Sequence, residues 1–320
     1  MAADTTAVTF ANRDGKRLFG TLHLPVPQVS NVPLIVLLSP GVKMRVGPHR
    51  LYNRMTAHFN ELGFAVFKFD FVGLGDSEGE LDREFLAQVY NDTESGAFVN
   101  DSIDALNWLE NEHEYSSFIL GGLCGGAITA LLTAQADRRA IGVLSLGMTT
   151  TLAMGARDRA EHASQGELAA LRKGYLRRAL DLKSWMRLLS FQSDFGTMFR
   201  SFKQAIVKKN VAAPAVSAEA QSGSSNANPL FPPAFFDVAL SERRVLLVFS
   251  GSDRLYWDFD EKFAQPYAKQ LAEVSGNYEL HVVEDANHVF SFREWEQTML
   301  RIASDWLTDY FVPEHKSVRS

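Results

Sequence analysis

Gly121-Gly122-Leu123-Cys124-Gly125-Gly126 follows an apolar run, residues 117–123, precedes a helical pattern, and carries the only cysteine of the chain. Small residues on both sides of the cysteine are typical of a sharp strand-to-helix turn that presents a nucleophile at its tip. The N–H group of Gly125 would then point at an oxyanion forming on the substrate. The alternative is that Cys124 is an ordinary small apolar core residue.

Further apolar runs flank this turn, at 33–38, 64–71, 141–146 and 245–249. They are too continuous for half-exposed strands and predict a mostly parallel sheet that is covered on both faces. Helical periodicity lies between them, at 51–62, 98–109, 128–132 and 292–306. A predicted hairpin spans residues 7–24. The fold class is therefore α/β, with helices on both faces of a central sheet.

The alternation of strands and helices stops between residues 152 and 240. We expect a helical cap there, inserted into one domain that spans 1–151 and 241–312, with a flexible tail at 313–320. A segment rich in Ala, Ser, Pro, Asn and Gln, residues 211–229, is expected to be a loop within the cap.

A cysteine nucleophile at such a turn needs a carboxylate and then a histidine later in the chain. Asp253 follows the apolar run 245–249, and His288 follows a second strand pattern at 278–283. Both would lie at the carboxyl ends of strands, where open α/β sheets bind ligands. His288 is predicted to deprotonate Cys124, and Asp253 to orient the imidazole ring. Asp258 and Asp260 are alternatives to Asp253.

A second oxyanion donor is expected in the loop after the strand at 33–38. Ser39-Pro40-Gly41-Val42 occupies that position, and the N–H of Val42 is the candidate. Gly41 permits a tight turn here. The alternative is that this turn has only a structural role.

These motifs together resemble the α/β-hydrolase superfamily. The turn Phe69-Asp70-Phe71-Val72-Gly73-Leu74-Gly75-Asp76-Ser77 resembles a conserved turn of that superfamily, with Val72 in place of its arginine, so an ion pair of that arginine is expected to be absent. Residues 33–150 resemble more narrowly the exosortase-system-associated hydrolases of type 1. The cysteine turn alone resembles aminoacyl shuttles that move acyl groups between carrier proteins. His49 and Arg50 would line the substrate entrance or, equally, begin a helix.

The composition excludes several other classes of protein. A formal net charge of −6 argues against general nucleic-acid binding. We find no transmembrane run, no secretion signal and no metal-ligand spacing, so we expect a cytoplasmic protein without metal or cofactor. Gly73 and Gly75 resemble a dinucleotide-binding turn, but Glu78 stands where the third glycine belongs and the acidic residues that follow would repel a pyrophosphate.

Charge is distributed unevenly along the chain. Residues 157–209 carry twelve basic and five acidic side chains, a net charge of +7 that leaves −13 for the rest. Such asymmetry favours an anionic partner, for example an acyl carrier protein or coenzyme A. A solvated helix face, the core of a cap, or a helix resting on an anionic membrane surface would give the same pattern.

The sequence thus predicts a covalent acyl intermediate on Cys124. Thiolates exchange readily with thioesters, which favours an acyltransferase that takes an acyl group from a thioester donor. The alternative is a thioesterase or carboxylesterase with the same residues and water as acceptor. A non-catalytic ligand receptor is a third hypothesis.

Overall fold

The structure is a computed structural model that describes residues 4–26, 31–81, 86–152 and 226–313. Most of the predicted cap, the basic segment at 157–209 and nearly all of the predicted tail lie outside these ranges.

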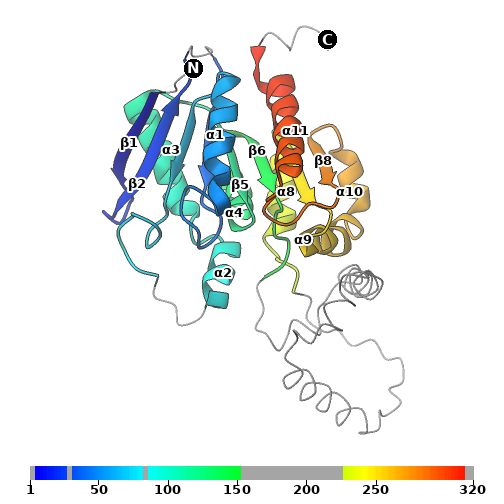
Figure 1. Cartoon of the computed structure of the whole chain (residues 1–320). Coiled ribbons are helices and arrows are strands. Elements are labelled where there is room, and N and C mark those ends of the chain that lie inside the picture. The colour runs from blue at the N-terminus through cyan, green and yellow to red at the C-terminus, as the bar shows by residue number, and fades with distance from the viewer. Residues whose placement is uncertain (1–3, 27–30, 82–85, 153–225, 314–320) are drawn as a thin grey trace, which may run out of the picture. The chain divides into compact units, whose positions relative to one another are not determined.

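Eight strands form one sheet in the order β1-β2-β4-β3-β5-β6-β7-β8 (Figure 1). Their bounds are β1 Asp4–Ala11, β2 Arg17–Leu24, β3 Leu34–Leu38, β4 Val66–Phe69, β5 Phe118–Leu123, β6 Ala140–Leu146, β7 Arg244–Ser250 and β8 Tyr278–Val283. The hairpin β1–β2 is antiparallel, and β2 joins β4 antiparallel. All pairs from β4 to β8 are parallel, which confirms the predicted mostly parallel sheet.

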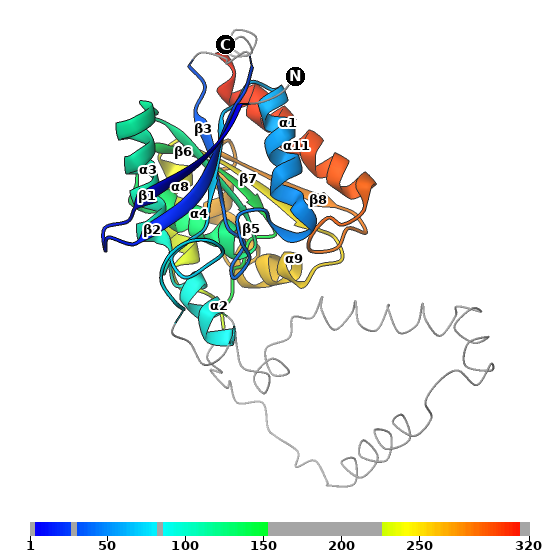
Figure 2. The same ribbon diagram turned by 60° about the vertical axis from the view of Figure 1, so that its left-hand side comes forward.

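Helices cover both faces of this sheet (Figures 1 and 2). One face carries α1 (Leu51–Glu61) and α11 (Arg293–Phe311), and the other α3 (Val99–His113), α4 (Gly125–Ala136) and α8 (Phe231–Leu240). The shorter elements are η1 (Pro48–Arg50), α2 (Leu86–Glu94), α9 (Arg254–Phe259), the π-helical turn η3 (Asp260–Ala264) and α10 (Ala268–Glu273). Each face has its own apolar core because the central strands are buried on both sides.

Helix α8 corrects the predicted end of the inserted segment. Residues 231–240 fall within the predicted cap, but Phe231, Phe235 and Val238 are buried in the core beside α4. Their spacing of three and four residues is that of a helix with one buried face, so this segment packs on the sheet. Of the region predicted as cap, 226–240 therefore belongs to the core.

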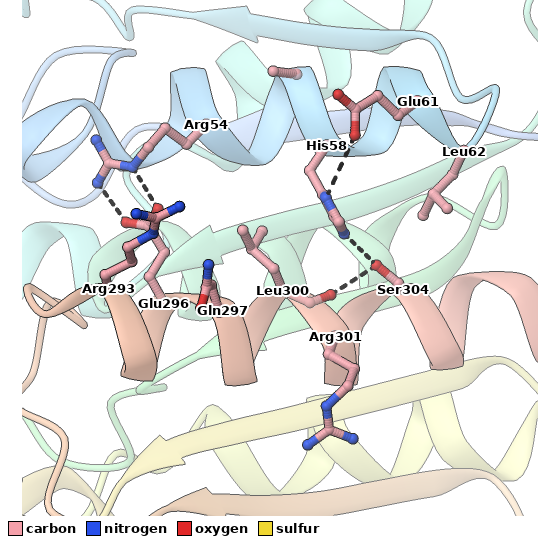
Figure 3. A pocket seen from close by; sticks show the side chains of 11 residues that line it. Arg54, His58, Glu61, Leu62, Arg293, Glu296, Gln297, Leu300, Arg301 and Ser304 are labelled. Atoms are coloured by element: carbon pink, nitrogen blue, oxygen red, sulfur yellow. Dashed lines mark hydrogen bonds and ion pairs between the residues drawn. The ribbon is translucent and has the colours of Figure 1, made fainter.

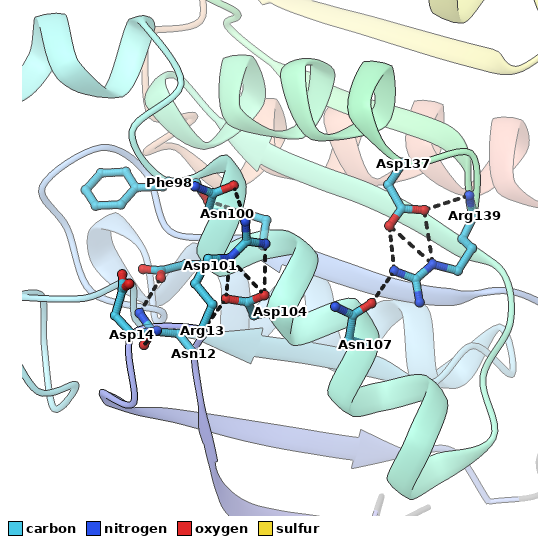
Figure 4. Close-up of polar contacts among 11 residues, drawn as sticks. Asn12, Arg13, Asp14, Phe98, Asn100, Asp101, Asp104, Asn107, Asp137 and Arg139 are labelled. Atoms are coloured by element: carbon cyan, nitrogen blue, oxygen red, sulfur yellow. Dashed lines mark hydrogen bonds and ion pairs between the residues drawn. The ribbon is translucent and has the colours of Figure 1, made fainter.

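The turn of the β1–β2 hairpin is fastened to α3 by polar contacts (Figure 4). Asn12 Nδ2 donates to Asp101 Oδ1 at 2.8 Å, and Arg13 forms an ion pair with Asp104 at 2.9 Å. The other oxygen of Asp101 accepts from the N–H of Val72 at 2.9 Å. Asp101 thus links the hairpin to the loop after β4. Because β2 pairs with β4, the hairpin also covers the edge that β4 would otherwise leave open.

The parallel strands bring distant residues to one edge of the sheet. Cys124 directly follows β5, Asp253 follows β7, and His288 lies in the loop between β8 and α11. In parallel strands these carboxyl ends face the same side, which is where the candidate site is found. No helix in the described ranges is both long and apolar enough to span a membrane.

Candidate active site

The backbone at Cys124 is held in a conformation that few side chains adopt. Its φ of 55° and ψ of −115° lie outside the ordinary regions, a strain of about 1–3 kcal/mol that surrounding contacts must sustain. Its N–H donates to the Leu146 carbonyl at 2.9 Å, and its carbonyl accepts from Ala127 at 3.0 Å. The side chain is partly exposed at the start of α4. This is the geometry of a nucleophile at a strand-to-helix turn.

Glycines allow this turn because other backbone lies where their side chains would be. A Cβ on Gly122 would lie 2.4 Å from the carbonyl carbon of Gly126, and one on Gly126 would lie 2.4 Å from the Leu38 carbonyl oxygen. A Cβ on Gly125 would lie 2.8 Å from Gly41 Cα. The turn therefore packs directly on the loop that follows β3.

This contact brings the two predicted oxyanion donors onto adjoining segments. Gly125 touches Gly41, and Val42 is the next residue in a turn closed by Lys43 N–H donating to the Pro40 carbonyl at 3.2 Å. Within the described ranges, neither the N–H of Gly125 nor that of Val42 has a hydrogen-bond acceptor. Unpartnered donors beside a nucleophile can stabilise an oxyanion.

His288 and Asp253 lie in direct contact. His288 Nδ1 is 2.5 Å from Asp253 Oδ2, while the other carboxylate oxygen caps α9 by accepting from Leu255 N–H at 3.4 Å. Asp258, an alternative in the sequence analysis, instead pairs with Arg254 at 3.4 Å, and Asp260 accepts from Gln265. The structure therefore brings Cys124, His288 and Asp253 together at one edge of the sheet.

The electrostatic state of His288 follows from its neighbours. Burial alone would lower its pKa, but hydrogen bonds with Asp253 and Cys124, and the negative charges of both, raise the pKa to about 10. At neutral pH the ring is then an imidazolium between a carboxylate and the sulfur.

A scan against protein-family models matches residues 35–299 to the Alpha/beta hydrolase family. This chain belongs to that family. Solved structures agree on the fold. A hypothetical protein, PA2218, from Pseudomonas aeruginosa is 16% identical with a TM-score of 0.55, over 97% of this chain and 94% of that one. No curated protein matches the chain.

Two structures with functional names share this α/β hydrolase fold. The esterase Pf2001 of Pyrococcus furiosus is 14% identical with a TM-score of 0.55, over 97% of this chain and 92% of that one. A dienelactone hydrolase from Anabaena variabilis is also 14% identical, with a TM-score of 0.53, over 97% of this chain and all of that one (100%). At these identities the likeness concerns the fold alone.

In this α/β hydrolase, His49 contacts the loop between β8 and α11 that carries His288, called here the histidine loop. Its Nε2 is 2.7 Å from the Val289 carbonyl oxygen, and its Nδ1 accepts from Arg54 at 2.6 Å. Arg54 in turn forms a two-pronged ion pair with Glu296 of α11, each contact 2.5 Å long (Figure 3). The structure thus places His49 beside the residue after His288.

Arg50 has a different place. It stands immediately before α1 with a φ of 64°, and its side chain makes no hydrogen bond or ion pair to any described residue. No arginine stands at position 72, and Asp70 of the same turn is paired with Arg45 from the loop after β3. The guanidinium comes from a different segment, which is why the sequence pattern around Val72 did not reveal it.

Two tyrosines near the site were not found from the sequence. The buried Tyr52 hydroxyl donates to the Leu38 carbonyl at 2.9 Å and accepts from Leu123 N–H at 2.7 Å, so it ties β3 to the residue before Cys124. Burial raises the pKa of Tyr90 on α2, and the charges of Cys124 and Glu94 raise it further. The ring of Tyr90 also packs against Gly41. A polar tip within the buried stripe of α1 is the signal that points to Tyr52.

The described residues offer no group of three or more His, Cys, Asp or Glu side chains that could hold a metal ion. The segment that follows β6 brings further polar groups close to His288. The hydroxyls of Thr149 and Thr150 are buried there and have no hydrogen-bond partner among the residues that the structure describes. Gly147 lies against the ring of His288, whose nearest atoms would be 3.5 Å from a Cβ at that position.

Proposed function

We propose that this chain is an acyltransferase that carries an acyl group on Cys124, taking it from a thioester donor and passing it to an acceptor. The observation that carries the proposal is the sulfur at a strained turn, with His288 and Asp253 beside it and a Gly125 N–H that has no acceptor within the described ranges. This set contains a nucleophile, a proton carrier and an oxyanion donor, which acyl transfer requires.

In the first step the Cys124 thiolate attacks the carbonyl carbon of the donor thioester and forms a new C–S bond. The carbonyl oxygen becomes an oxyanion, stabilised by the N–H of Gly125 and by that of Val42. When the tetrahedral intermediate collapses, the bond to the departing thiol breaks, and the imidazolium of His288 gives that thiol its proton. The products are the acyl-Cys124 thioester, a free thiol and a neutral His288.

The second step uses the neutral His288 as a base. Acylation removes the negative charge of the sulfur, which is one of the causes that raise the pKa of His288. His288 can then accept a proton from an acceptor thiol, amine or hydroxyl as it attacks the acyl-Cys124 carbonyl. Breaking the acyl–sulfur bond regenerates the thiolate beside an imidazolium.

Hydrolysis is the second candidate function, and family membership favours it. The chain matches a hydrolase family, and the structures that share its fold include proteins named as an esterase and a dienelactone hydrolase. In that case water is the acceptor in the second step, and the same three side chains act. The two candidates differ only in what attacks the acyl-Cys124 carbonyl.

The donor is proposed to be an acyl carrier protein or coenzyme A, in a cytoplasmic setting. Support comes from the net charge of +7 in residues 157–209, which suits an anionic partner. The narrower resemblances, to exosortase-associated hydrolases and to aminoacyl shuttles, favour the hydrolase and the transferase respectively.

Intact-protein mass spectrometry tests the covalent step. The protein is incubated with a panel of short, medium and long acyl-coenzyme A thioesters and with aminoacyl thioesters, beside the Cys124→Ala variant. A mass gain equal to one acyl group in the wild type and not in the variant supports the proposal. An adduct that forms equally on Cys124→Ala contradicts it.

The fate of the adduct separates the two candidates. The acylated protein is exchanged into buffer with or without an acceptor thiol or amine at millimolar concentration. An acyltransferase loses its adduct faster with the acceptor and yields the acyl-acceptor product. Free acid at the same rate in both samples would establish the hydrolase instead.

A further inference from the structure

The two proposed oxyanion donors belong to segments that leave the sheet from neighbouring strands. Gly125 begins α4 directly after Cys124, which follows β5, and Val42 lies in the loop after β3. The distance between these donors therefore depends on how far apart β3 and β5 end. That distance matters for catalysis, because each donor must lie about 2.7–3.1 Å from the same developing oxyanion.

The last hydrogen bond of the β3–β5 ladder lies at this point. In the register Leu38 is opposite Gly122, and at the start of the ladder the N–H of Leu34 donates to the Ser117 carbonyl at 3.1 Å. In parallel strands every second residue of a strand bonds to the same neighbour. The last position of the ladder is therefore formed by the Leu38 carbonyl and the N–H of Leu123.

The hydroxyl of Tyr52 contacts both of these groups. It accepts from the N–H of Leu123 at 2.7 Å and donates to the Leu38 carbonyl at 2.9 Å. That carbonyl oxygen also lies against α4, because a Cβ on Gly126 would be 2.4 Å from it. One hydroxyl from the first turn of α1 thus connects the end of β3 with the residue before Cys124.

Tyr52 is itself held firmly in the core. It is fully buried, and its N–H donates to the Val46 carbonyl at 3.2 Å while its carbonyl accepts from the Thr56 hydroxyl at 2.6 Å. Gly47, with a φ of 68°, lies against the ring, where a Cβ would be 3.1 Å from Cδ1. Burial raises the pKa of Tyr52, and the negative charge of Cys124 raises it further, so the phenol keeps its proton.

We propose that Tyr52 is a positioning residue for acyl transfer: its hydroxyl sets the spacing between β3 and β5 and so aligns the Cys124 sulfur with the oxyanion donors. The inference rests on the proposed function, since it concerns the oxyanion that acylation forms. Tyr52 is buried and acts through Leu38 and Leu123. Without the hydroxyl these two groups stay unsatisfied or bond directly to each other, and either change moves the sulfur. A displacement of about 1 Å can lower a rate about 100-fold.

Two reactions of Cys124 test this role. With p-nitrophenyl acetate the thiolate attacks the carbonyl carbon, an oxyanion forms, and nitrophenolate leaves. With iodoacetamide the same thiolate displaces iodide, and no oxyanion forms. In Tyr52→Phe the acetylation rate should fall about 10–100-fold while the alkylation rate changes less than about twofold. A fall by the same factor in both reactions, or acetylation at the wild-type rate, overturns the proposal.

Controls separate this effect from a loss of stability. Rates are measured well below the unfolding midpoint of each variant. Tyr115→Phe, a half-buried tyrosine before the opposite end of β5, should react like wild type in both reactions. If Tyr52→Phe does not fold, two unnatural residues replace it. Tyr52→4-aminophenylalanine keeps a donor for the Leu38 carbonyl and should retain most of the acetylation rate, whereas Tyr52→4-methylphenylalanine fills the same space and should lose it. Equal rates for these two overturn the proposal.

The ester also separates this inference from the proposed function. If it acetylates wild-type Cys124 and no acyl thioester does, the proposed donor is wrong, while a loss confined to acetylation in Tyr52→Phe still supports the role of Tyr52. A wild type that neither the ester nor any thioester acylates on Cys124 overturns both.

Discussion

The nucleophile and its base are held in two different ways. Cys124 stands on a turn whose backbone is packed against backbone, where Gly122 meets Gly126 and Gly126 meets the end of β3. His288 stands in a loop that is fastened by side-chain hydrogen bonds to carbonyls. Ser250 Oγ donates to the Asn287 carbonyl at 2.8 Å, and His49 contacts that of Val289 at 2.7 Å.

We therefore expect changes at the Cys124 turn to affect the stability of the fold, and changes at the contacts of the His288 loop to affect the position of the base. Any added atom in the turn must displace backbone, so a change there affects folding. The contacts of Ser250 and His49 with the loop that carries His288 are single hydrogen bonds, each contributing about 0.5–1.5 kcal/mol, so losing one of them should move the base and leave the fold intact. The predictions below test this contrast.

The largest expected effect is on the orientation of the base. Asp253→Asn should lower the acylation rate of Cys124 by about 10³–10⁴-fold, because the amide favours the wrong imidazole tautomer and removes a charge that stabilises the imidazolium. Asparagine caps helices as well as aspartate does, so α9 and the unfolding free energy should be retained. Asp260→Asn, on the same segment, is the matched control. A loss below about tenfold in Asp253→Asn would exclude Asp253 as the orienting carboxylate.

The next effect is on stability at the turn. Gly126→Ala places a Cβ 2.4 Å from the Leu38 carbonyl oxygen and should lower the free energy of unfolding in urea by about 3 kcal/mol or more. Gly276→Ala has no atom within 4 Å of the added Cβ and should change it by less than about 1 kcal/mol. Equal unfolding midpoints for the two variants would refute the backbone packing described for the turn.

A smaller effect is expected from the outer support of the histidine loop. His49→Ala or Arg54→Gln should lower the acylation rate about tenfold with little change in KM, because the base shifts without loss of substrate contacts. His49→Gln keeps a donor for the Val289 carbonyl and should restore most of the rate. Arg301→Gln, at an exposed position on α11 that lines the same pocket between α1 and α11 as Arg54 does (Figure 3), is the control. Equal rates for His49→Ala and wild type would show that the contact does not position His288.

The smallest effect concerns pH. Since the pKa of His288 is about 10, the ring is cationic below that pH and neutral above it. Loss of the cation leaves the thiolate unpaired and more nucleophilic, so alkylation of Cys124 by iodoacetamide should show a further rise with a midpoint near pH 10. The modified peptide is quantified by mass spectrometry. His288→Gln should lack this rise, and a variant that retains it would assign the step to another group.

Much of the fold could be predicted because burial on both faces imposes continuous apolar runs. The β5 and β7 runs, and the small residues around Cys124, are local patterns with few structural solutions. Helix α2, Leu86–Glu94, was missed because only Val89, Thr93 and Glu94 are buried in it, which leaves no apolar stripe. The core position of α8 was missed because the segment before it has no strand or helix pattern.

The residues of the candidate site also fall into a group that the sequence predicts and a group that it does not. Cys124, Asp253 and His288 each follow the carboxyl end of a strand, and the parallel order of the sheet makes their meeting predictable. The contacts of Tyr52, Arg45 and His49 join segments that are distant in sequence and have no repeated spacing. Arg54 and Glu296, for example, are 242 residues apart. Such pairings depend on how the loops fold over the sheet.

The most direct test of the central claim is a burst experiment on the first turnover. The protein is mixed with excess acyl thioester, the released thiol is followed, and the quenched protein is digested and mapped. The account predicts a burst of one thiol per chain, with the acyl group on the peptide that contains Cys124 and no burst from Cys124→Ala. Steady release without a burst, no acyl group on that peptide, and the same release rate from Cys124→Ala would contradict it.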